Sequence, residues 1–214
     1  MRKLIIATIG FEEKFTVRMI TRHGLDKGDK VLLLTGPPTE KSTIAINLVR
    51  EFITKYYSKD VTLLVREIPV HNFYDAVHII KQNIMNEAKG VTNIVVNLSG
   101  GMRILIIETL LALTVLSVKN ITVEIETEDS STIITIPTEF ISMKLPIRKR
   151  HIEILQILAQ AQEPITIKTI AEELKIDDST IRRHLLKLRK MRLVEVKKGK
   201  PLLIQLSPLA KLLM

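Results

Sequence analysis

Four short hydrophobic runs recur along the first half of the chain, and apolar and polar residues do not alternate within them. The runs are KLIIATI (3–9), KVLLLT (30–35), VTLLV (61–65) and TNIVVNL (92–98). Such runs are typical of parallel strands that are covered by helices on both faces. We therefore expect four buried strands in one parallel sheet.

Between the runs, apolar residues return every three or four positions, which predicts amphipathic helices over residues 40–57 and 72–89. Asn72 is suited to cap the second helix, and Gly90 is suited to end it. A longer apolar stretch, 104–118, is too short to span a membrane and contains Glu108. We expect this stretch to form a helix buried in a core or in a subunit interface.

The residues from 121 to 136 follow a different pattern. ITVEIE alternates apolar and polar residues, and DSS then leads into TIITIP, which predicts an antiparallel hairpin with one solvated face. Glu124, Glu126 and Glu128 share a face of the first strand. Their carboxylates would suit a divalent metal, but charges in such a strand more often form a solvated face that discourages pairing between sheets.

The resulting order, βαβαβαβα followed by ββ, predicts an α/β fold with a Rossmann-like, doubly wound and mostly parallel sheet. In the usual order for such sheets, the first and fourth strands lie side by side. Their following helices go to opposite faces, which opens a crevice at the carboxyl ends of these strands. We assign this first domain to residues 1–137.

A second pattern begins after residue 147. Helical spacings occur in RKRHIEILQILAQA (148–161), IKTIAEELK (167–175) and DSTIRRHLLKLRKM (178–191), and LVEV and LLIQL then flank the basic turn KKGKP. Three helices followed by a hairpin are the layout of a small winged helix-turn-helix domain. We assign this domain to residues 148–214, and the irregular stretch 138–147 to a linker.

Composition narrows the class of protein. Of the 214 residues, 46% are hydrophobic and none is cysteine, which excludes disulfides and thiol chemistry and fits a reducing cytoplasm. The opening MRKLIIATIG has too short an apolar run for a signal peptide. We expect a folded, soluble, cytoplasmic protein that does not enter a membrane.

The net charge of +9 is concentrated in the second domain. Residues 1–144 contain 17 Lys and Arg against 16 Asp and Glu, whereas residues 145–214 contain 15 against 7. A basic helix-turn-helix domain after a neutral domain predicts double-stranded DNA as a partner. The alternatives are a solvated basic surface and a fold that mediates protein contacts.

The expected DNA-binding residues lie in the third helix of this domain and in its hairpin. The first turns of that helix meet base edges in the major groove, and basic residues of the helix and the hairpin meet phosphates. These residues are Ser179, Thr180, Arg182, Arg183, Lys187, Lys197, Lys198 and Lys200.

The ends of the first and fourth strands carry residues suited to an anion. The first strand ends in TIGF and the fourth in NLSGGMR. Glycines let a ligand approach the backbone, the next helix offers unpaired N–H groups, and Arg103 adds a fork of donors. The crevice would bring together Gly10, Phe11, Ser99, Gly100, Gly101 and Arg103. A phosphate or phosphodiester would suit them, and the alternative is a tight turn with Ser99 as the helix cap.

Other nucleotide motifs are incomplete. GPPTEKST (36–43) resembles a phosphate-binding loop, but Glu40 replaces the second glycine and two prolines remove N–H groups. No GxGxxG follows the first strand, and the five histidines show no metal-ligand spacing. We therefore expect neither a metal nor a resident cofactor, and we place Thr35 and Pro37 beside the crevice as lining residues.

GF after the first strand and LSGGMR after the fourth, followed by TIAEELKIDDSTIRRHLLKLRKMRLVEV, resemble the archaeal CRISPR-associated transcription regulators in which a CARF domain precedes a winged helix-turn-helix. The resemblance covers essentially the whole chain. It implies a homodimer whose two CARF domains form a pocket for a cyclic oligoadenylate, with cyclic tetra-adenylate as the first candidate. It also implies ligand contacts from Gly10, Phe11, Asn97, Ser99, Gly100, Gly101, Met102 and Arg103.

The resemblance leaves three functions open. The favoured one is a ligand-controlled regulator of CRISPR-associated genes without chemistry of its own. The alternative is a metal-independent ring nuclease that linearises the ligand. Relatives that cut it commonly carry a lysine where this chain has Arg103, which is poorly suited to proton transfer. In the third, the protein binds DNA and its α/β domain only dimerises.

The second domain departs from the family at one position. Such winged helices usually carry a glycine after the third helix, whereas this chain has Arg192.

Overall fold

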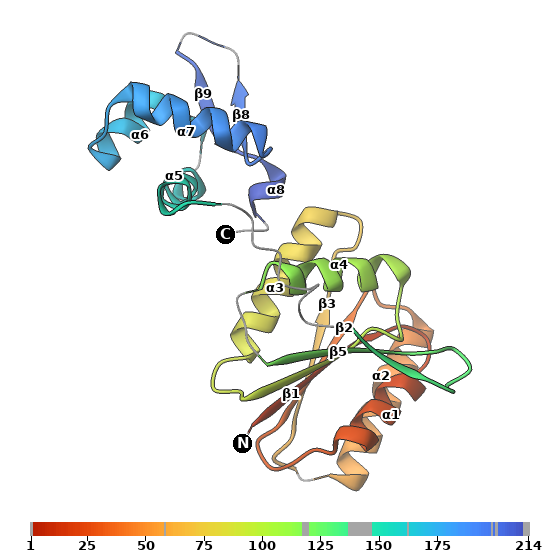
Figure 1. Ribbon diagram of the computed structural model, residues 1–214. Helices are drawn as coiled ribbons and strands as arrows, with labels where there is room; N and C mark the ends of the chain where they lie inside the picture. The colour runs from red at the N-terminus through yellow and green to blue at the C-terminus, as the bar shows by residue number, and fades with distance from the viewer. Residues whose placement is uncertain are drawn as a thin grey trace. The chain divides into compact units, whose positions relative to one another are not determined.

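The computed structural model of the protein divides into two compact units, residues 1–143 and residues 144–214 (Figure 1). It describes residues 2–57, 59–116, 120–136, 147–161, 163–197, 199 and 201–211. The linker predicted for residues 138–147 lies outside the described residues, apart from Ile147.

The first unit is built on a six-stranded sheet. Its elements are β1 (Lys3–Ile9), α1 (Lys14–His23), β2 (Lys30–Thr35), α2 (Glu40–Tyr56), β3 (Thr62–Glu67), α3 (Phe73–Glu87), β4 (Asn93–Asn97), α4 (Arg103–Thr114), β5 (Ile121–Glu126) and β6 (Ile133–Ile136). The strand order is β3-β2-β1-β4-β5-β6, and only the last pair is antiparallel. The predicted Rossmann-like sheet is confirmed, including the pairing of the first and fourth strands.

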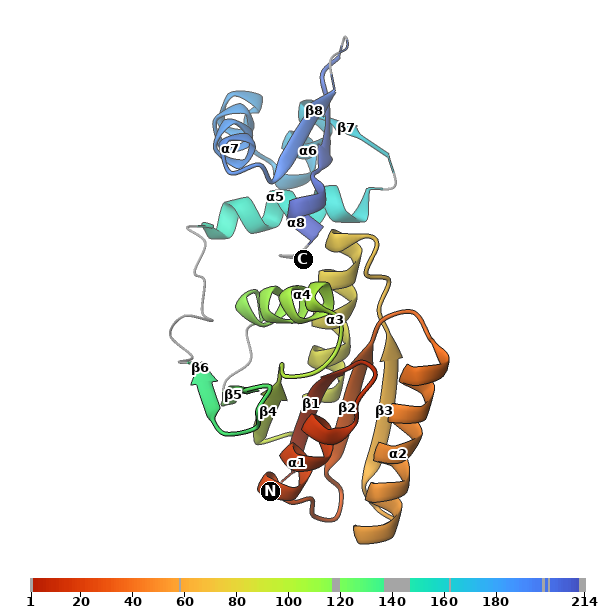
Figure 2. The same cartoon turned by 90° about the vertical axis from the view of Figure 1, so that its right-hand side faces the viewer.

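Helices cover both faces of this sheet, α1 and α2 on one face and α3 and α4 on the other (Figures 1 and 2). On the first face, Ile5 and Val31 share a buried cluster with Met19 of α1 and Val49 of α2. Leu4, whose side chain points to the opposite face, is fully buried as well. Burial on both faces explains why the strand sequences are apolar without interruption.

The hairpin of β5 and β6 differs from the prediction. The alternation in β5 predicts a solvated face for Glu124 and Glu126, but both side chains are buried. Glu128 lies beyond β5 and is exposed. The prediction is wrong because the two glutamates pair with basic residues of α1, more than 100 residues earlier in the chain.

The second unit packs helices against a three-stranded sheet. Its elements are α5 (Lys149–Gln160), β7 (Ile165–Thr166), α6 (Ile167–Leu174), α7 (Asp178–Lys190), β8 (Val194–Lys197), β9 (Leu203–Leu206) and α8 (Pro208–Lys211). β8 and β9 form an antiparallel hairpin, and β7 pairs with the other edge of β9. Ile154 of α5, Ile170 of α6 and Leu188 of α7 share one core. The predicted helix-turn-helix domain is confirmed.

Arg192 follows α7 where such domains usually carry a glycine. Its φ is 59°, in the left-handed region that glycine adopts more readily than other residues. Its N–H donates a hydrogen bond of 3.0 Å to the carbonyl of Arg189, and the N–H of Leu193 donates one of 2.9 Å to the carbonyl of Leu188. The chain therefore makes the usual turn after the helix with a different residue.

The apolar helix expected over residues 104–118 is α4, which ends at Thr114. No helix in the described ranges is long and apolar enough to cross a membrane. Within α4, Glu108 is fully buried, and its carboxylate oxygens have no hydrogen-bond partner among the described residues. Burial raises the pKa of Glu108 to about 7.

The burial of Glu108 predicts a specific dependence of stability on pH. Between the ordinary glutamate pKa of about 4.3 and about 7, the folded unit binds more protons than the unfolded chain. Its stability therefore falls as the pH rises through this window. One pKa unit is worth about 1.4 kcal/mol, so the whole shift costs about 4 kcal/mol, of which about 3 kcal/mol falls between pH 5 and pH 8.

Glu108→Gln removes this titration and keeps the size of the side chain. Urea unfolding at pH 5 and pH 8, followed by circular dichroism, should show that the variant gains about 3 kcal/mol over the wild type between the two pH values. A difference in free energy of unfolding that is the same at both pH values would contradict the assignment.

Candidate functional site

The loops after β1 and β4 line one hollow at the carboxyl end of the sheet. The two strands pair in parallel with Ala7 opposite Asn97, so both chains leave the sheet at the same edge. The hollow has a volume of about 280 Å³. Its lining residues are Gly10, Phe11, Glu12, Phe15, Ser99, Gly100, Gly101 and Met102. The structure thus brings most of the expected ligand residues together.

The backbones of the two loops are in close contact. A Cβ atom at Gly10 would lie 3.0 Å from Cα of Gly101, and one at Gly100 would lie 3.0 Å from the carbonyl oxygen of Thr8. The Thr8 hydroxyl donates a hydrogen bond of 2.5 Å to the carbonyl of Gly100. Gly101 has a φ of 94°, which other residues rarely adopt. The close packing of the loops is therefore sufficient to explain these glycines, whether or not a ligand binds.

Asn97 and Ser99 hold the loop after β4 in place. Oδ1 of Asn97 accepts a hydrogen bond of 2.9 Å from the backbone N–H of Ser99, and its Nδ2 donates to Glu124 at 3.3 Å. Oγ of Ser99 accepts one of 2.7 Å from the backbone N–H of Glu126. Asn97 is buried and does not line the hollow. Its place fits a positioning role better than a ligand contact.

The alternative role of Ser99 as the cap of α4 is wrong. The residue that precedes α4 is Met102, which makes no side-chain cap hydrogen bond. The hydroxyl of Ser99 is instead bonded to β5. Within the described ranges no side chain caps the first turn of α4, so its N–H groups are open to a ligand or solvent.

Two buried carboxylates of β5 bind α1 to the sheet behind this loop. Nη2 of Arg22 lies 2.6 Å from Oε1 of Glu124, and its Nη1 lies 2.9 Å from Oε2 of Glu126. Arg18 reaches Glu126 at 2.7 Å. His23 reaches Glu124 at 3.0 Å. Burial alone would raise the pKa of both glutamates, but hydrogen bonds from their partners lower each pKa below its ordinary value.

Phe11 lines the hollow, whereas Arg103 follows the lining residue Met102 but is not itself a lining residue. Both side chains are exposed and could meet a ligand. Arg103 is the first residue of α4 and pairs with no acidic side chain in the described part of the chain. Phe11 is 63% exposed, and Nζ of Lys41 lies 5.8 Å from the centre of its ring. A guanidinium beside a helix N-terminus suits a phosphate, and an exposed ring suits a base.

Thr35 and Pro37, which the sequence places beside the crevice, do not line the hollow. Thr35 is buried at the end of β2, and Pro37 is exposed. Gly36 between them provides the space for Met102, because a Cβ atom at Gly36 would lie 2.6 Å from Sδ of Met102. The end of β2 therefore supports the hollow through the Met102 side chain.

Sequence reasoning missed Glu12 and Phe15, which also line the hollow. Phe15 is buried, and its Cδ2 lies 3.8 Å from the position of a Cβ atom at Gly100. Glu12 is exposed and pairs with Lys14 at 2.6 Å. The one available signal is that both residues follow closely after the GF pair.

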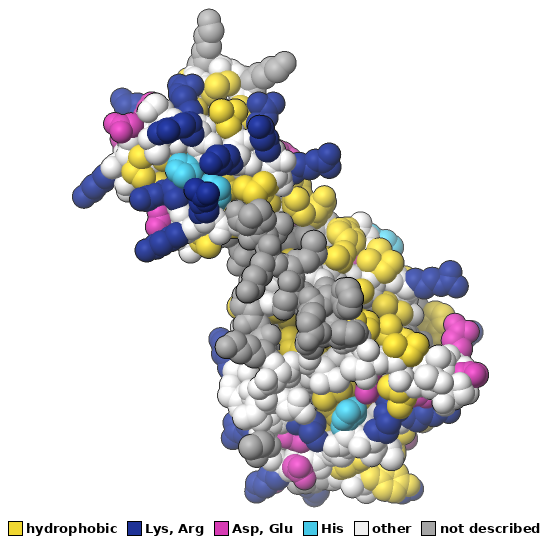
Figure 3. Space-filling view, in the orientation of Figure 1, with side chains coloured by type: hydrophobic (Ala, Val, Ile, Leu, Met, Phe, Trp, Pro, Cys, Tyr) yellow, Lys and Arg dark blue, Asp and Glu magenta, His cyan; other side chains and the backbone are white. Residues whose placement is uncertain are grey.

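The second unit carries a basic surface along α7, and Lys and Arg side chains gather on the face of this unit in view in Figure 3. The exposed polar residues of the helix after Asp178 are Ser179, Arg182, Arg183, Lys187, Arg189 and Lys190. Thr180 is half-buried and accepts a hydrogen bond of 3.2 Å from Arg183. Lys197 is exposed at the end of β8, whereas Lys198 and Lys200 lie outside the described residues. Arg189 and Lys190 were not among the expected DNA-binding residues.

Behind this surface, His184 of α7 packs against His151 of α5 with ring centres 5.2 Å apart. Burial lowers the pKa of both imidazoles, and neighbouring positive groups such as Lys187 lower each pKa further. The pair therefore favours the neutral form. No cluster of three or more His, Cys, Asp or Glu residues suited to a metal ion occurs in the part of the chain that the structure describes.

Comparisons with known proteins match both units. Residues 3–137 match the family model described as Csa3 CRISPR-associated Rossmann-like domain, and residues 148–196 match the model described as bacterial regulatory protein, arsR family. No curated protein matches the chain. Similar solved structures include the crystal structure of protein VC1899 from Vibrio cholerae, with 11% sequence identity and a TM-score of 0.47. That alignment covers 98% of this chain and 63% of the other.

The contact between the two loops predicts a large effect of Gly101→Ala. The new Cβ atom would lie 3.3 Å from Thr8 and the backbone would keep a φ of 94°. We expect a loss of about 2 to 3 kcal/mol in the free energy of unfolding, from left-handed strain and crowding together. Urea unfolding followed by circular dichroism measures this loss.

Gly90→Ala is the matched control, because Gly90 has a φ of 74° but nothing within 4 Å of the new Cβ atom. It should cost about 1 kcal/mol, from the backbone strain alone. If Gly101→Ala cost no more than Gly90→Ala, the loops would not depend on close backbone contact.

Proposed function

The chain belongs to the family of the Csa3 CRISPR-associated Rossmann-like domain and joins that domain to a helix-turn-helix of the arsR family. This pairing of domains is that of a CRISPR-associated DNA-binding regulator. On this premise we propose that the first unit senses a cyclic oligoadenylate, with cyclic tetra-adenylate as the first candidate. Binding of the ligand would change the affinity of the second unit for double-stranded DNA.

The observation that carries the proposal is the hollow between the loops of β1 and β4. It combines approachable backbone at Gly10 and Gly101 with the uncapped N-terminus of α4. The N–H groups of that helix and the guanidinium of Arg103 would bind a phosphodiester. Phe11 would stack on an adenine, because an exposed aromatic ring can stack on the face of any base. The phosphodiester and the adenine of the ligand therefore each have a partner of suitable chemistry.

A homodimer follows from the symmetry of such a ligand. Cyclic tetra-adenylate has a two-fold axis, so two copies of the hollow can bind equivalent halves of one molecule. α4 starts beside the hollow and exposes an apolar side chain, Ile107, with half of its surface open. We place part of the dimer interface on this helix because apolar surface gains free energy when another copy covers it.

On the DNA side, α7 would enter the major groove and the β8–β9 hairpin would reach the flanking backbone. The first turns of α7 carry Arg182 and Arg183, and its last turn adds Lys187, Arg189 and Lys190. Basic residues on a helix of this kind bind phosphates and make affinity fall with salt. The regulator would act without chemistry of its own.

Titration calorimetry of cyclic tetra-adenylate into the full chain at fixed salt tests the ligand site. We expect one ligand per dimer, and Arg103→Ala should weaken binding at least ten-fold because it removes a charge-assisted contact to the phosphodiester. Arg50→Ala is the matched control, since Arg50 is exposed on α2 of the same unit. It should bind as the wild type does.

Absence of heat in the wild type, or equal affinities of the wild type and Arg103→Ala, would contradict the proposal. Chromatography of the same mixtures tests the alternative of a ring nuclease. Recovery of the cyclic ligand supports sensing alone, whereas linear products would show that the hollow also cleaves its ligand.

A further inference from the structure

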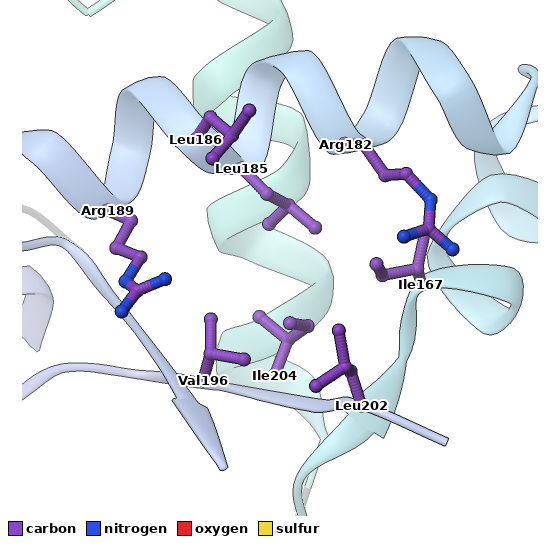
Figure 4. Close-up of a pocket in the computed structure, with 8 residues that line it drawn as sticks. All are labelled: Ile167, Arg182, Leu185, Leu186, Arg189, Val196, Leu202 and Ile204. Carbon is purple, nitrogen blue, oxygen red and sulfur yellow. The ribbon is translucent and has the colours of Figure 1, made fainter. Parts of the chain in front are cut away.

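An apolar groove of about 200 Å³ lies between α7 and the β8–β9 hairpin of the second unit. Figure 4 shows Leu185 of α7 pointing toward Val196, Ile204 and Leu202 on the other side, and Leu186 of the same helix also lines the groove. Ile167 also lines it. Arg182 and Arg189 extend from α7 at its two ends (Figure 4). The groove is therefore apolar in the middle and positively charged at both ends.

Leu186 is the unusual residue of this groove. It is 59% exposed, whereas its neighbour Leu185 is 5% exposed and belongs to the core. All residues of α7 are described, and every other exposed residue of the helix is charged or a serine. The unit does not need Leu186 for its own core. Leu186 and the exposed Leu202 line the same groove, and an apolar patch with basic residues at its edge points to contact with a partner.

The positive charges beside Leu186 indicate what kind of partner would bind. Arg182 and Arg189 stand four residues before and three residues after Leu186, so all three side chains lie along one side of the helix. Neither arginine pairs with an acidic side chain in the described ranges. A partner with negative charges on both sides of an apolar group would therefore complement this surface. The major groove of DNA does so where a thymine exposes its C5-methyl group between phosphates.

We infer that Leu186 is a specificity-determining residue that contacts a thymine methyl group in the operator. This inference rests on the proposed function, because it requires α7 to lie in the major groove. Arg182 and Arg189 would bind phosphates, or guanine O6 and N7, on either side of that thymine. The leucine would then distinguish thymine from the other bases, none of which carries a methyl group in the major groove.

The experiment removes single methyl groups from the DNA and truncates the Leu186 side chain in the protein. Binding sites are first selected from a random duplex library with the full chain. Each thymine of a selected duplex is then replaced in turn by uracil, which lacks only the C5-methyl group, and affinity is measured by fluorescence anisotropy at fixed salt. For the wild type, one or two uracil positions should weaken binding about four-fold, as expected for one buried methyl group.

For Leu186→Ala, the same uracil positions should have no effect, because the side chain that met the methyl group has gone. Ile152→Ala is the matched control, since Ile152 is an exposed aliphatic residue on α5 of the same unit. It should keep the uracil pattern of the wild type. This design compares duplexes within each protein, so an overall loss of affinity or of stability in a variant does not affect the result.

Three outcomes would overturn the inference. Uracil could be tolerated everywhere by the wild type, it could weaken Leu186→Ala as much as the wild type, or Leu186→Ala could bind every duplex as tightly as the wild type does. The last result would indicate that Leu186 contacts an acidic protein partner instead of DNA. Failure to select any duplex would contradict DNA binding itself, which separates the failure of the proposed function from the failure of this inference.

Discussion

Contact between two backbones, at the ends of β1 and β4, shapes the rest of the first unit. The strands pair in parallel, and their following loops meet where Gly10 lies against Gly101 and Gly100 against Thr8. Any side chain at Gly10 or Gly100 would bring a Cβ atom within 3.0 Å of the facing backbone. Because this contact needs glycine, the same residues that close the turn also leave backbone open to a ligand. Close packing of the loops and binding of a ligand therefore both favour glycine at these positions.

Buried charges stabilise the back of the same loop. Glu124 and Glu126 are neutralised by Arg22 and its neighbours on α1, and the loop is bonded to β5 through Asn97 and Ser99. Separating a buried ion pair leaves an uncompensated charge in the interior, which strongly destabilises the protein. The network therefore favours the one arrangement of loop, strand and helix in which every charge is paired. A preorganised loop loses less conformational entropy when it binds. Arg103 is not part of this network.

The pattern of the sequence was sufficient for the parts of the fold that depend on burial. Uninterrupted apolar runs predicted the parallel strands, and the usual strand order placed GF and LSGGMR at one edge. Pairing between distant residues could not be read in this way. Glu124 and Glu126 alternate with apolar residues as solvated residues do, and nothing in β5 reveals that Arg22 will cover them.

The same limit applies at single positions of both units. Asn97 belongs to the expected ligand residues, but hydrogen bonds inside the unit occupy its side chain. Glu12 and Phe15 line the hollow where the chain enters α1, and the sequence pattern does not give the path of the chain there. Leu186 has an apolar side chain of the kind found in cores, and only the structure shows that it is exposed. Periodicity predicts which face of an element is apolar, whereas the partner of a single side chain depends on the assembled fold.

In the proposed function, a ligand in the first unit controls DNA binding by the second. Two sites are coupled only if the ligand has different affinities for two arrangements of the protein, and each site then changes the affinity of the other by the same factor. The most direct measurement is the affinity of the full chain for a selected duplex, with and without saturating cyclic tetra-adenylate, at fixed salt. We expect a change of at least five-fold, within the usual range of allosteric coupling, that disappears in Arg103→Ala. Equal affinities in the presence and absence of the ligand would contradict it.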